Sequence, residues 1–183
     1  MQAAHPLVSY ADMERWPDDG RRYELYNGEV FVIPSPLTIH QVILGRLFIA
    51  LSEFVREHGG TVFLSPLDVV LTEYDVVQPD VLLFVPEREH LVHLRQVLRV
   101  PPDLAIEILS KGTVRNDRGC KQWLLAQHGV REYWLVDPDA VSIEVYTLTG
   151  SDLVLSHVAK GSDPVQSSLL PELSLRPGDM IPA

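Results

Sequence analysis

Cysteine is nearly absent from this 183-residue chain, and its scarcity excludes two kinds of protein. The one cysteine, Cys120, cannot form an internal disulfide or a thiolate zinc cluster, so the sequence carries no sign of an oxidising compartment. A nucleophilic role for Cys120 with His128 is conceivable, whereas a small residue packed on a helix is the simpler interpretation.

Long apolar runs are also lacking. The longest, such as residues 81–85, are far shorter than the roughly 20 residues that cross a bilayer, so we expect no membrane-spanning segment and no membrane partner. Residues 1–10 have neither the basic opening nor the apolar stretch of an export signal. The expectation is therefore a cytoplasmic protein.

The chain has no excess of positive charge. A formal net charge of −10 argues against a non-specific polyanion binder, because like charges repel a phosphate backbone. One segment reverses this balance, since residues 111–121 hold four basic side chains (Lys111, Arg115, Arg118 and Lys121) and one acid, Asp117. Either a local phosphate site or a solvated basic helix face is compatible with that count.

The apolar patterning predicts short strands with helices between them. The dipeptide at residues 27–28, Asn-Gly, predicts the two-residue turn of a β-hairpin, and Thr38–His58 has helical spacing, with Thr38 as its cap. Residues 87–100 suit either a helix or a loop. Further strands are predicted at residues 61–64, 68–71, 81–85, 104–109, 132–136, 142–147 and 153–158, and a second long helix at residues 116–127.

Strands that alternate with helices predict an α/β (α+β) fold, a mixed β-sheet with a helix on each side. The strands at 81–85 and 104–109 should be adjacent, and both long helices should pack on the sheet. The 46% hydrophobic content supplies a core, and no change of composition marks a linker. We therefore expect one domain, residues 1–183.

Two carboxylates occupy positions where strands are otherwise apolar. Glu107 lies inside the strand at 104–109, where an unpaired charge would cost several kcal/mol, and Asp80 opens the strand at 81–85. Asp80 alone could cap its strand, and Glu107 alone could pair with a buried base. Together on neighbouring strands they suit a divalent cation such as Mg²⁺, which takes one or two carboxylates and keeps several waters.

Downstream, Asp117 and Lys121 are four residues apart on the predicted helix and so share a face. Because this helix follows the Glu107 strand, Lys121 could be directed back toward Glu107. An exposed Asp–Lys pair is the plainer alternative.

These residues resemble the Uma-two family of proposed endonucleases, which belongs to the PD-(D/E)XK, restriction-endonuclease-like superfamily. The resemblance rests on Pro79-Asp80, on Glu107-Ile108-Leu109-Ser110 with Asp117 and Lys121, and on the stretch from Gly129 to Pro138. Earlier segments agree, including Tyr23-Glu24-Leu25, and Pro36 with His40. The similarity runs from about Tyr10 to Pro177.

The resemblance implies a mixed sheet flanked by helices and Mg²⁺-dependent hydrolysis of phosphodiester bonds. The acidic pair transfers to Asp80 and Glu107, but Leu109 stands where the superfamily has its strand lysine. In this family a helix lysine is thought to substitute, which here is Lys121. Glu24 and His40 match family positions that line the site.

The mechanism that follows has Asp80, Glu107 and the backbone carbonyl of Ile108 holding Mg²⁺, for which Mn²⁺ could substitute. Lys121 would orient water or stabilise charge on the phosphoryl oxygens. The substrate would be nucleic acid, with DNA favoured, and a homodimer would cut both strands of a duplex. The alternatives are an inactive nuclease fold that binds nucleic acid or protein, and a hydrolase for another phosphorylated substrate.

Overall fold

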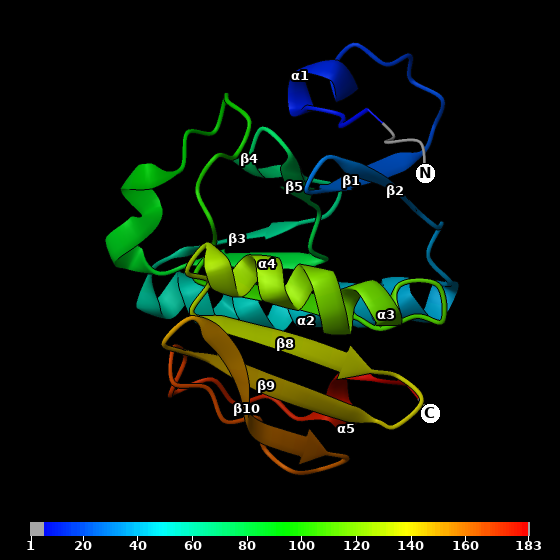
Figure 1. The fold of residues 1–183 in the computed structure, drawn as a ribbon. Coiled ribbons are helices and arrows are strands. Elements are labelled where there is room, and N and C mark those ends of the chain that lie inside the picture. Colours follow the sequence, from blue (N-terminus) through cyan, green and yellow to red (C-terminus); the bar gives the residue numbers. More distant parts are fainter. Residues whose placement is uncertain (1–5, 183) are drawn as a thin grey trace.

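The computed structural model describes residues 6–182, which form two β-sheets with helices packed against them (Figure 1). The elements in chain order are α1 (Tyr10–Met13), β1 (Arg22–Tyr26), β2 (Glu29–Ile33), α2 (Thr38–His58), β3 (Thr61–Leu64), β4 (Val69–Thr72), β5 (Asp75–Val77), β6 (Val81–Phe84), a 3-10 helix (Pro86–Leu91), β7 (Leu104–Ile108), α3 (Val114–Asn116), a π-helical turn (Asp117–Lys121), α4 (Gln122–Gln127), β8 (Glu132–Asp137), β9 (Ser142–Thr149), β10 (Asp152–Lys160) and α5 (Pro177–Met180).

The larger sheet has six strands in the order β10-β9-β8-β7-β6-β3. It is mixed, because β7 and β8 are parallel while its other neighbouring pairs are antiparallel. β6 and β7 are adjacent, with Val81 opposite Ile106, as their apolar sequences predict. The prediction of a mixed sheet with these two strands side by side is confirmed.

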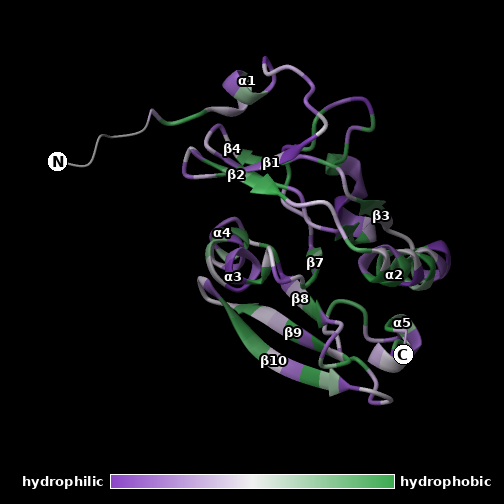
Figure 2. Ribbon diagram, turned by 90° about the vertical axis from the view of Figure 1, so that its right-hand side faces the viewer, coloured by the Kyte–Doolittle hydropathy of each residue, from purple (hydrophilic) through white to green (hydrophobic). Residues whose placement is uncertain are grey.

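The strands are buried on both faces, which explains their continuous apolar sequences. Alternate residues of β6 and β7, such as Leu83 and Ile106, join a core with α2, whereas Leu82 and Ala105 point to the opposite face and join a core with α4. Figure 2 shows α2 and the α3–α4 segment on opposite sides of this sheet. Glu107, one residue beyond Ile106, therefore points to the α4 side.

The smaller sheet has the order β2-β1-β5-β4 and shares a core with the α4 face of the larger sheet through Tyr26, Val69 and Val77. Its β1–β2 hairpin turns at Asn27 and Gly28, which have φ of 50° and 78°, as the two-residue turn requires. β5 was not predicted from the sequence, and a four-stranded sheet separate from the main one was not expected either.

Helix α2 has the predicted bounds and ends at Gly59, whose φ is 81°. The prediction that Thr38 caps it is wrong, because the cap position is Leu37 and no side chain caps the helix. By length and composition alone α2 could cross a membrane, a test that core helices of soluble proteins also pass. Ile43, Leu47 and Leu51 are buried against the larger sheet.

The predicted helix at 116–127 is present but is not uniform. It begins at Val114, and residues 117–121 form a π-helical turn before α4. Between Pro86 and Leu91 the chain forms a 3-10 helix, and most of the segment that follows is irregular, so a loop describes residues 92–100 better than a helix. Cys120, expected to be packed, is exposed.

The chain after β10 is attached to the larger sheet by the buried carboxylate of Glu132. Glu132 accepts hydrogen bonds from the backbone N–H groups of Ser168 (2.7 Å) and Leu169 (3.1 Å) and from the hydroxyls of Ser167 and Ser168. This acid at the start of β8 therefore stabilises the tail and stands apart from the site described next.

Candidate active site

Asp80 and Glu107 lie together in a cleft of about 480 Å³ that also holds His40, Ile108 and Lys121. Asp80 immediately precedes β6, and Glu107 is near the end of the adjacent strand β7. Their exposed fractions are 6% and 5%. The strand pairing thus brings together the two carboxylates that the sequence singles out.

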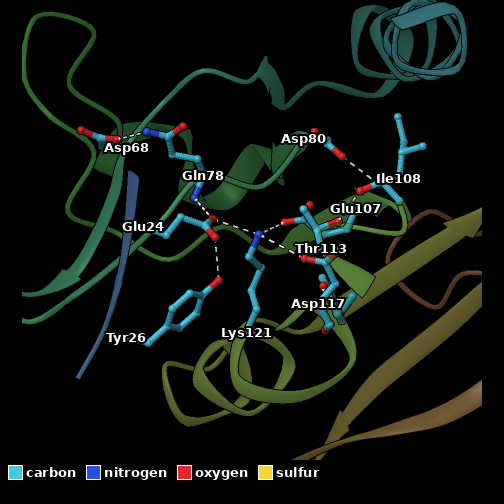
Figure 3. Close-up of polar contacts among 12 residues, drawn as sticks. Glu24, Tyr26, Asp68, Gln78, Asp80, Glu107, Ile108, Thr113, Asp117 and Lys121 are labelled. Atoms are coloured by element: carbon cyan, nitrogen blue, oxygen red, sulfur yellow. Dashed lines mark hydrogen bonds and ion pairs between the residues drawn. The ribbon is translucent and has the colours of Figure 1, made fainter. Parts of the chain in front are cut away.

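Two donors hold the Asp80 carboxylate. Its Oδ2 accepts a hydrogen bond from the backbone N–H of Ile108 at 2.8 Å, and His40 Nε2 lies 3.0 Å from the same oxygen (Figure 3 shows the Ile108 contact). Asp80 Oδ1 has no hydrogen-bond partner among residues 6–182. His40, near the start of α2, therefore contacts the site through Asp80, and one Asp80 oxygen remains available to a ligand.

Lys121 is the centre of a buried charge cluster. Its Nζ lies 2.7 Å from Glu107 Oε1, 2.9 Å from Glu24 Oε1 and 3.4 Å from Asp117 Oδ1 (Figure 3). Its side chain is 4% exposed. The helix after β7 therefore directs Lys121 back to Glu107, and the alternative of a solvent-exposed Asp–Lys pair is wrong.

Glu24 reaches this cluster from β1 of the smaller sheet. Its Oε1 accepts a hydrogen bond from the backbone N–H of Gln78 at 2.6 Å, and its Oε2 accepts one from the hydroxyl of Tyr26 at 2.6 Å. Because Lys121 contacts both Glu24 and Glu107, it joins the two sheets. The interior of the site depends on that contact.

Burial sets the ionisation of these groups. It raises the pKa of Glu107 well above its usual value; Lys121 opposes this shift, while Asp117, Asp80 and Glu24 add to it. For Lys121, burial alone would lower the pKa, but the negative charges of Glu107 and Glu24 outweigh burial and raise it well above the usual value. The surrounding carboxylates thus favour the charged form of Lys121, whereas burial disfavours the charged form of Glu107 and the contact with Lys121 favours it.

Asp117 is the least satisfied acid of the cluster. Neither of its carboxylate oxygens has a hydrogen-bond partner among the described residues, and it is 1% exposed. Burial raises its pKa, against the effect of Lys121. Asp117 contacts Lys121 within the same helical turn and is therefore a partner of the lysine.

The basic segment at 111–121 offers less positive charge than its composition suggests. Arg118 donates two hydrogen bonds to Glu144, at 2.6 and 2.9 Å, and Lys121 is surrounded by carboxylates. Lys111 and Arg115 are exposed and have no ion-pair partner among residues 6–182. Of the four basic residues in this segment, only these two are free to meet a phosphate.

Sequence reasoning did not identify Tyr26 or Gln78, which fix Glu24, or Arg22, which lines the cleft. Tyr26 and Arg22 flank Glu24 at alternate positions of β1, so the period of two along a strand could have placed them on its face. Gln78 has no comparable signal, because it contacts Glu24 across 54 residues of sequence.

The donor set fits a magnesium ion that keeps most of its water. Within residues 6–182 no three His, Cys, Asp or Glu side chains form a metal-binding group. Asp80 and Glu107 provide two hard carboxylates in an open cleft, and Glu107 Oε2, like Asp80 Oδ1, accepts no hydrogen bond from these residues. Mg²⁺ is commonly bound by one or two carboxylates, whereas an all-protein cage would need more.

Three comparisons bear on this site. A family model, Uma2, with the description "Putative restriction endonuclease", matches residues 10–178. A search of curated proteins finds no match. A crystal structure described as "a putative nuclease belonging to DUF820", from Anabaena variabilis, covers 94% of this chain and 97% of its own, with a TM-score of 0.80 and 22% identity. The family resemblance and the nuclease-like fold are thereby confirmed.

Proposed function

The chain belongs to the Uma2 family, and from that membership we propose that it is a Mg²⁺-dependent endonuclease that hydrolyses phosphodiester bonds of DNA. The observation that carries the proposal is the position of Lys121 Nζ, 2.7 Å from Glu107 in the cleft that also holds Asp80. Two carboxylates and a fixed cation are the groups that phosphoryl transfer requires.

Mg²⁺, or Mn²⁺ in its place, would be held by Asp80, Glu107 and the Ile108 carbonyl, and when bound it supplies a Lewis acid for the phosphoryl oxygen and acidifies water. The Ile108 N–H already points to Asp80. The N–H and C=O of one strand residue face the same neighbouring strand, so the carbonyl is directed to that side as well.

Lys121 acts through its charge. A lysine whose pKa is raised by carboxylates donates hydrogen bonds and does not accept a proton at neutral pH. It therefore stabilises the negative charge that develops on the phosphoryl oxygens as water attacks phosphorus in line. A preorganised cation of this kind contributes several kcal/mol to lowering a barrier.

The other acids and His40 are positioning residues. His40 and the Ile108 N–H hold one oxygen of Asp80. This fixes the orientation of the carboxylate and therefore the direction of its other oxygen. Glu24 and Asp117 both contact Lys121 and would keep it in place with Glu107 serving as a metal ligand. We include a symmetric homodimer in the proposal, because two one-site copies can cut both strands of a duplex.

Plasmid cleavage in Mg²⁺ or Mn²⁺ tests the proposal, with wild type, Glu107→Gln and Glu172→Gln purified identically. Glu172 is exposed and does not line the cleft, so Glu172→Gln replaces a carboxylate by an amide in the same way without touching the site. We expect cleavage by wild type and Glu172→Gln and a loss of at least a hundredfold in Glu107→Gln. Equal cleavage by all three would identify a contaminant and remove the assignment.

One observation favours a second function, a nuclease fold that binds nucleic acid without cutting it. Glu107 Oε1 is already occupied by Lys121, and a stable internal ion pair of this kind could exclude a metal. Calorimetric measurement of Mg²⁺ and DNA binding distinguishes the endonuclease from the binding module. Mg²⁺ binding that is lost in the Asp80→Ala, Glu107→Ala double variant supports the enzyme, whereas DNA binding without Mg²⁺ binding supports the module.

A further inference from the structure

A second hollow of about 380 Å³ adjoins the cleft and has no role in the mechanism above. It lies between α1, the chain that connects α1 to β1, and the segment around Asp68. Its lining includes Trp16, Arg21, Arg22, Tyr23, Asp68 and Gln78. Figure 1 shows α1 and this connection beside the smaller sheet.

One wall of the hollow is aromatic and fixed. Trp16 meets Tyr23 edge to face, with ring centroids 5.0 Å apart and an interplanar angle of 79°. The Tyr23 hydroxyl donates a hydrogen bond to Asp19 at 2.6 Å, which holds the pair. Trp16 lines the hollow and remains 36% exposed, so part of its indole is accessible there. Unpaired bases stack on aromatic side chains of this kind, with little dependence on sequence.

The lining of the hollow also includes a hydrogen-bond acceptor, Asp68. Asp68 Oδ1 accepts a hydrogen bond from Gln78 Nε2 at 2.6 Å, which leaves Oδ2 without a partner among residues 6–182. A carboxylate accepts hydrogen bonds from the amino and imino N–H groups on the edge of a base. Stacking and edge recognition are therefore both possible within one hollow.

Arg22 and Gln78 line both this hollow and the cleft. Arg22 has no ion-pair or hydrogen-bond partner in the described part of the chain, unlike Arg21, which lies 3.7 Å from Asp19. A free guanidinium is suited to a phosphate. The rest of the hollow has four acids (Glu14, Asp18, Asp19 and Asp68) against Arg21, so a neutral base fits there better than a second phosphate.

We propose that this hollow receives an unpaired nucleobase from the nucleotide next to the phosphodiester in the cleft, with the linking phosphate at Arg22. The inference rests on the proposed function, because it takes the cleft to be where a phosphodiester binds. A base stacked in a duplex cannot enter, since only a single-stranded or extruded base exposes its faces and edge. The preferred substrate is therefore DNA in which one nucleotide is unpaired or can be extruded from the duplex.

Trp16 fluorescence provides a direct test. In a Trp123→Phe parent, the remaining tryptophans are Trp16 and Trp134, and Trp134 is fully buried. The probes are a 12-nucleotide single strand and the blunt duplex of the same sequence, with Ca²⁺ in place of Mg²⁺ to suppress cleavage. We expect saturable quenching by the single strand and little by the duplex.

Variants then locate the contact. The affinity of each variant for a fluorescently labelled single strand is measured by anisotropy. Trp16→Ala should weaken binding about tenfold, and Trp16→Phe should restore most of it, because one stacked base contributes roughly 1–3 kcal/mol. Arg22→Ala should also weaken binding and reduce the salt dependence by about one phosphate contact. Arg15→Ala is the control, since Arg15 is exposed in the same region and does not line the hollow. Thermal melting verifies that each variant is folded.

Failure here and failure of the proposed function give different results. If wild type cleaves plasmid but Trp16→Ala and Arg22→Ala bind the single strand as their parents do, only this inference is overturned. If wild type binds the single strand with quenching of Trp16 but never cleaves DNA, the proposed base site is supported and the proposed endonuclease activity is overturned. Equal quenching by single strand and duplex, or no binding of either, overturns the inference.

Discussion

Lys121 keeps its charge in a site where it is 4% exposed because three carboxylates surround it. Those acids come from β1, β7 and its own helical turn, so their effect on the pKa of Lys121 requires the assembled fold. In the proposed mechanism this buried cation serves catalysis as well as stability. Removal of the lysine charge would leave the buried carboxylates without a partner, and an uncompensated buried charge strongly destabilises the folded state.

We therefore expect Lys121→Met to abolish most cleavage and also to destabilise the protein. Loss of one partner from a buried ion pair costs about 3–5 kcal/mol, reduced where Glu107 takes up a proton. The Lys121→Met, Glu107→Gln double variant removes both charges and should recover part of that stability without recovering cleavage. Urea unfolding at pH 7.5 and plasmid cleavage measure the two effects. Wild-type cleavage by Lys121→Met would remove Lys121 from the mechanism.

The partly buried carboxyl of Asp68 should make the free energy of unfolding depend on pH. Burial raises its pKa, although a hydrogen bond from Gln78 opposes the shift. The folded protein thus binds this proton more tightly than the unfolded chain, so ionised Asp68 lowers stability at pH values above the raised pKa. Asp68→Asn should increase the free energy of unfolding at pH 7, by less than about 1 kcal/mol because the group is partly solvated.

The gain from Asp68→Asn should shrink as the pH falls through the raised pKa and vanish well below 3.8, the ordinary value, where Asp68 is protonated in both states. Urea unfolding from pH 3.5 to 8 without DNA measures it. Asp163→Asn is the matched control, because Asp163 is an exposed acid that lines neither the cleft nor the second hollow. A stability difference independent of pH would show that the effect is not one of ionisation.

The sequence could identify Asp80, Glu107 and the lysine that Glu107 meets, but not the contact between Lys121 and Glu24. Glu107 was recognisable because a charge inside an apolar strand must find compensation. Its compensating cation was expected from the helix that follows, and Lys121 Nζ is there at 2.7 Å. Glu24 gives no such signal, since its contact with Lys121 joins residues far apart in sequence and depends on how the two sheets pack.

The π-helical turn at Asp117–Lys121 is the element that places the lysine. A helix continued with the ordinary period would rotate Lys121 relative to α4, whose buried face carries Leu124 and Leu125. One extra residue in the turn lets Lys121 face Glu107 while α4 still packs on the sheet. Turns of this kind often occur at functional sites.

Gly119 allows that argument to be tested. Deletion of Gly119 should convert the turn to ordinary helix, move Lys121 by about 100° around the axis and reduce cleavage at least a hundredfold. Gly119→Ala is the control, because a Cβ there meets nothing within 4 Å and alanine favours helix by about 1 kcal/mol. It should cleave normally and melt slightly higher. Normal cleavage by the deletion variant would show that the π-helical turn is dispensable.

Local signals determined which elements could be predicted. The Asn27-Gly28 turn and the Gly59 helix end were recognisable because both need positive φ, which few residues adopt readily. β5 has three residues, too few for an alternating pattern to be visible. Its pairing with β1, Leu25 opposite Val76, is non-local, so the separate smaller sheet could not be read from periodicity.

At the scale of the whole molecule, the two sheets are held together partly by charge. The smaller sheet contributes Glu24 to the cleft and borders the second hollow, while the larger sheet contributes Asp80 and Glu107. The chain carries a net charge of −10, and its free basic groups near the cleft are few. Substrate binding should therefore depend on the metal more than on a general electrostatic attraction.

The last prediction concerns assembly, and the exposed side of α2 provides its surface. Val42 and Ile49 are seven residues apart on the side opposite the buried Ile43 and Leu47, with Arg46 and Glu53 beside them. In an antiparallel pair related by a two-fold axis near Ile49, the two copies of Ile49 would meet and each Arg46 would face the partner's Glu53. We expect light scattering to give twice the mass of one chain for wild type.

Ile49→Glu places a charge at the centre of that contact, so it should give a single-chain mass and convert double-strand cleavage of plasmid into nicking. Leu94→Glu is the control, because Leu94 is equally apolar, is 83% exposed and lies on a loop away from α2. A wild type that is already monomeric at the assay concentration would eliminate the dimer. Each copy would then act alone on one strand, which agrees with a cleft that holds one pair of carboxylates, Asp80 and Glu107, and one lysine.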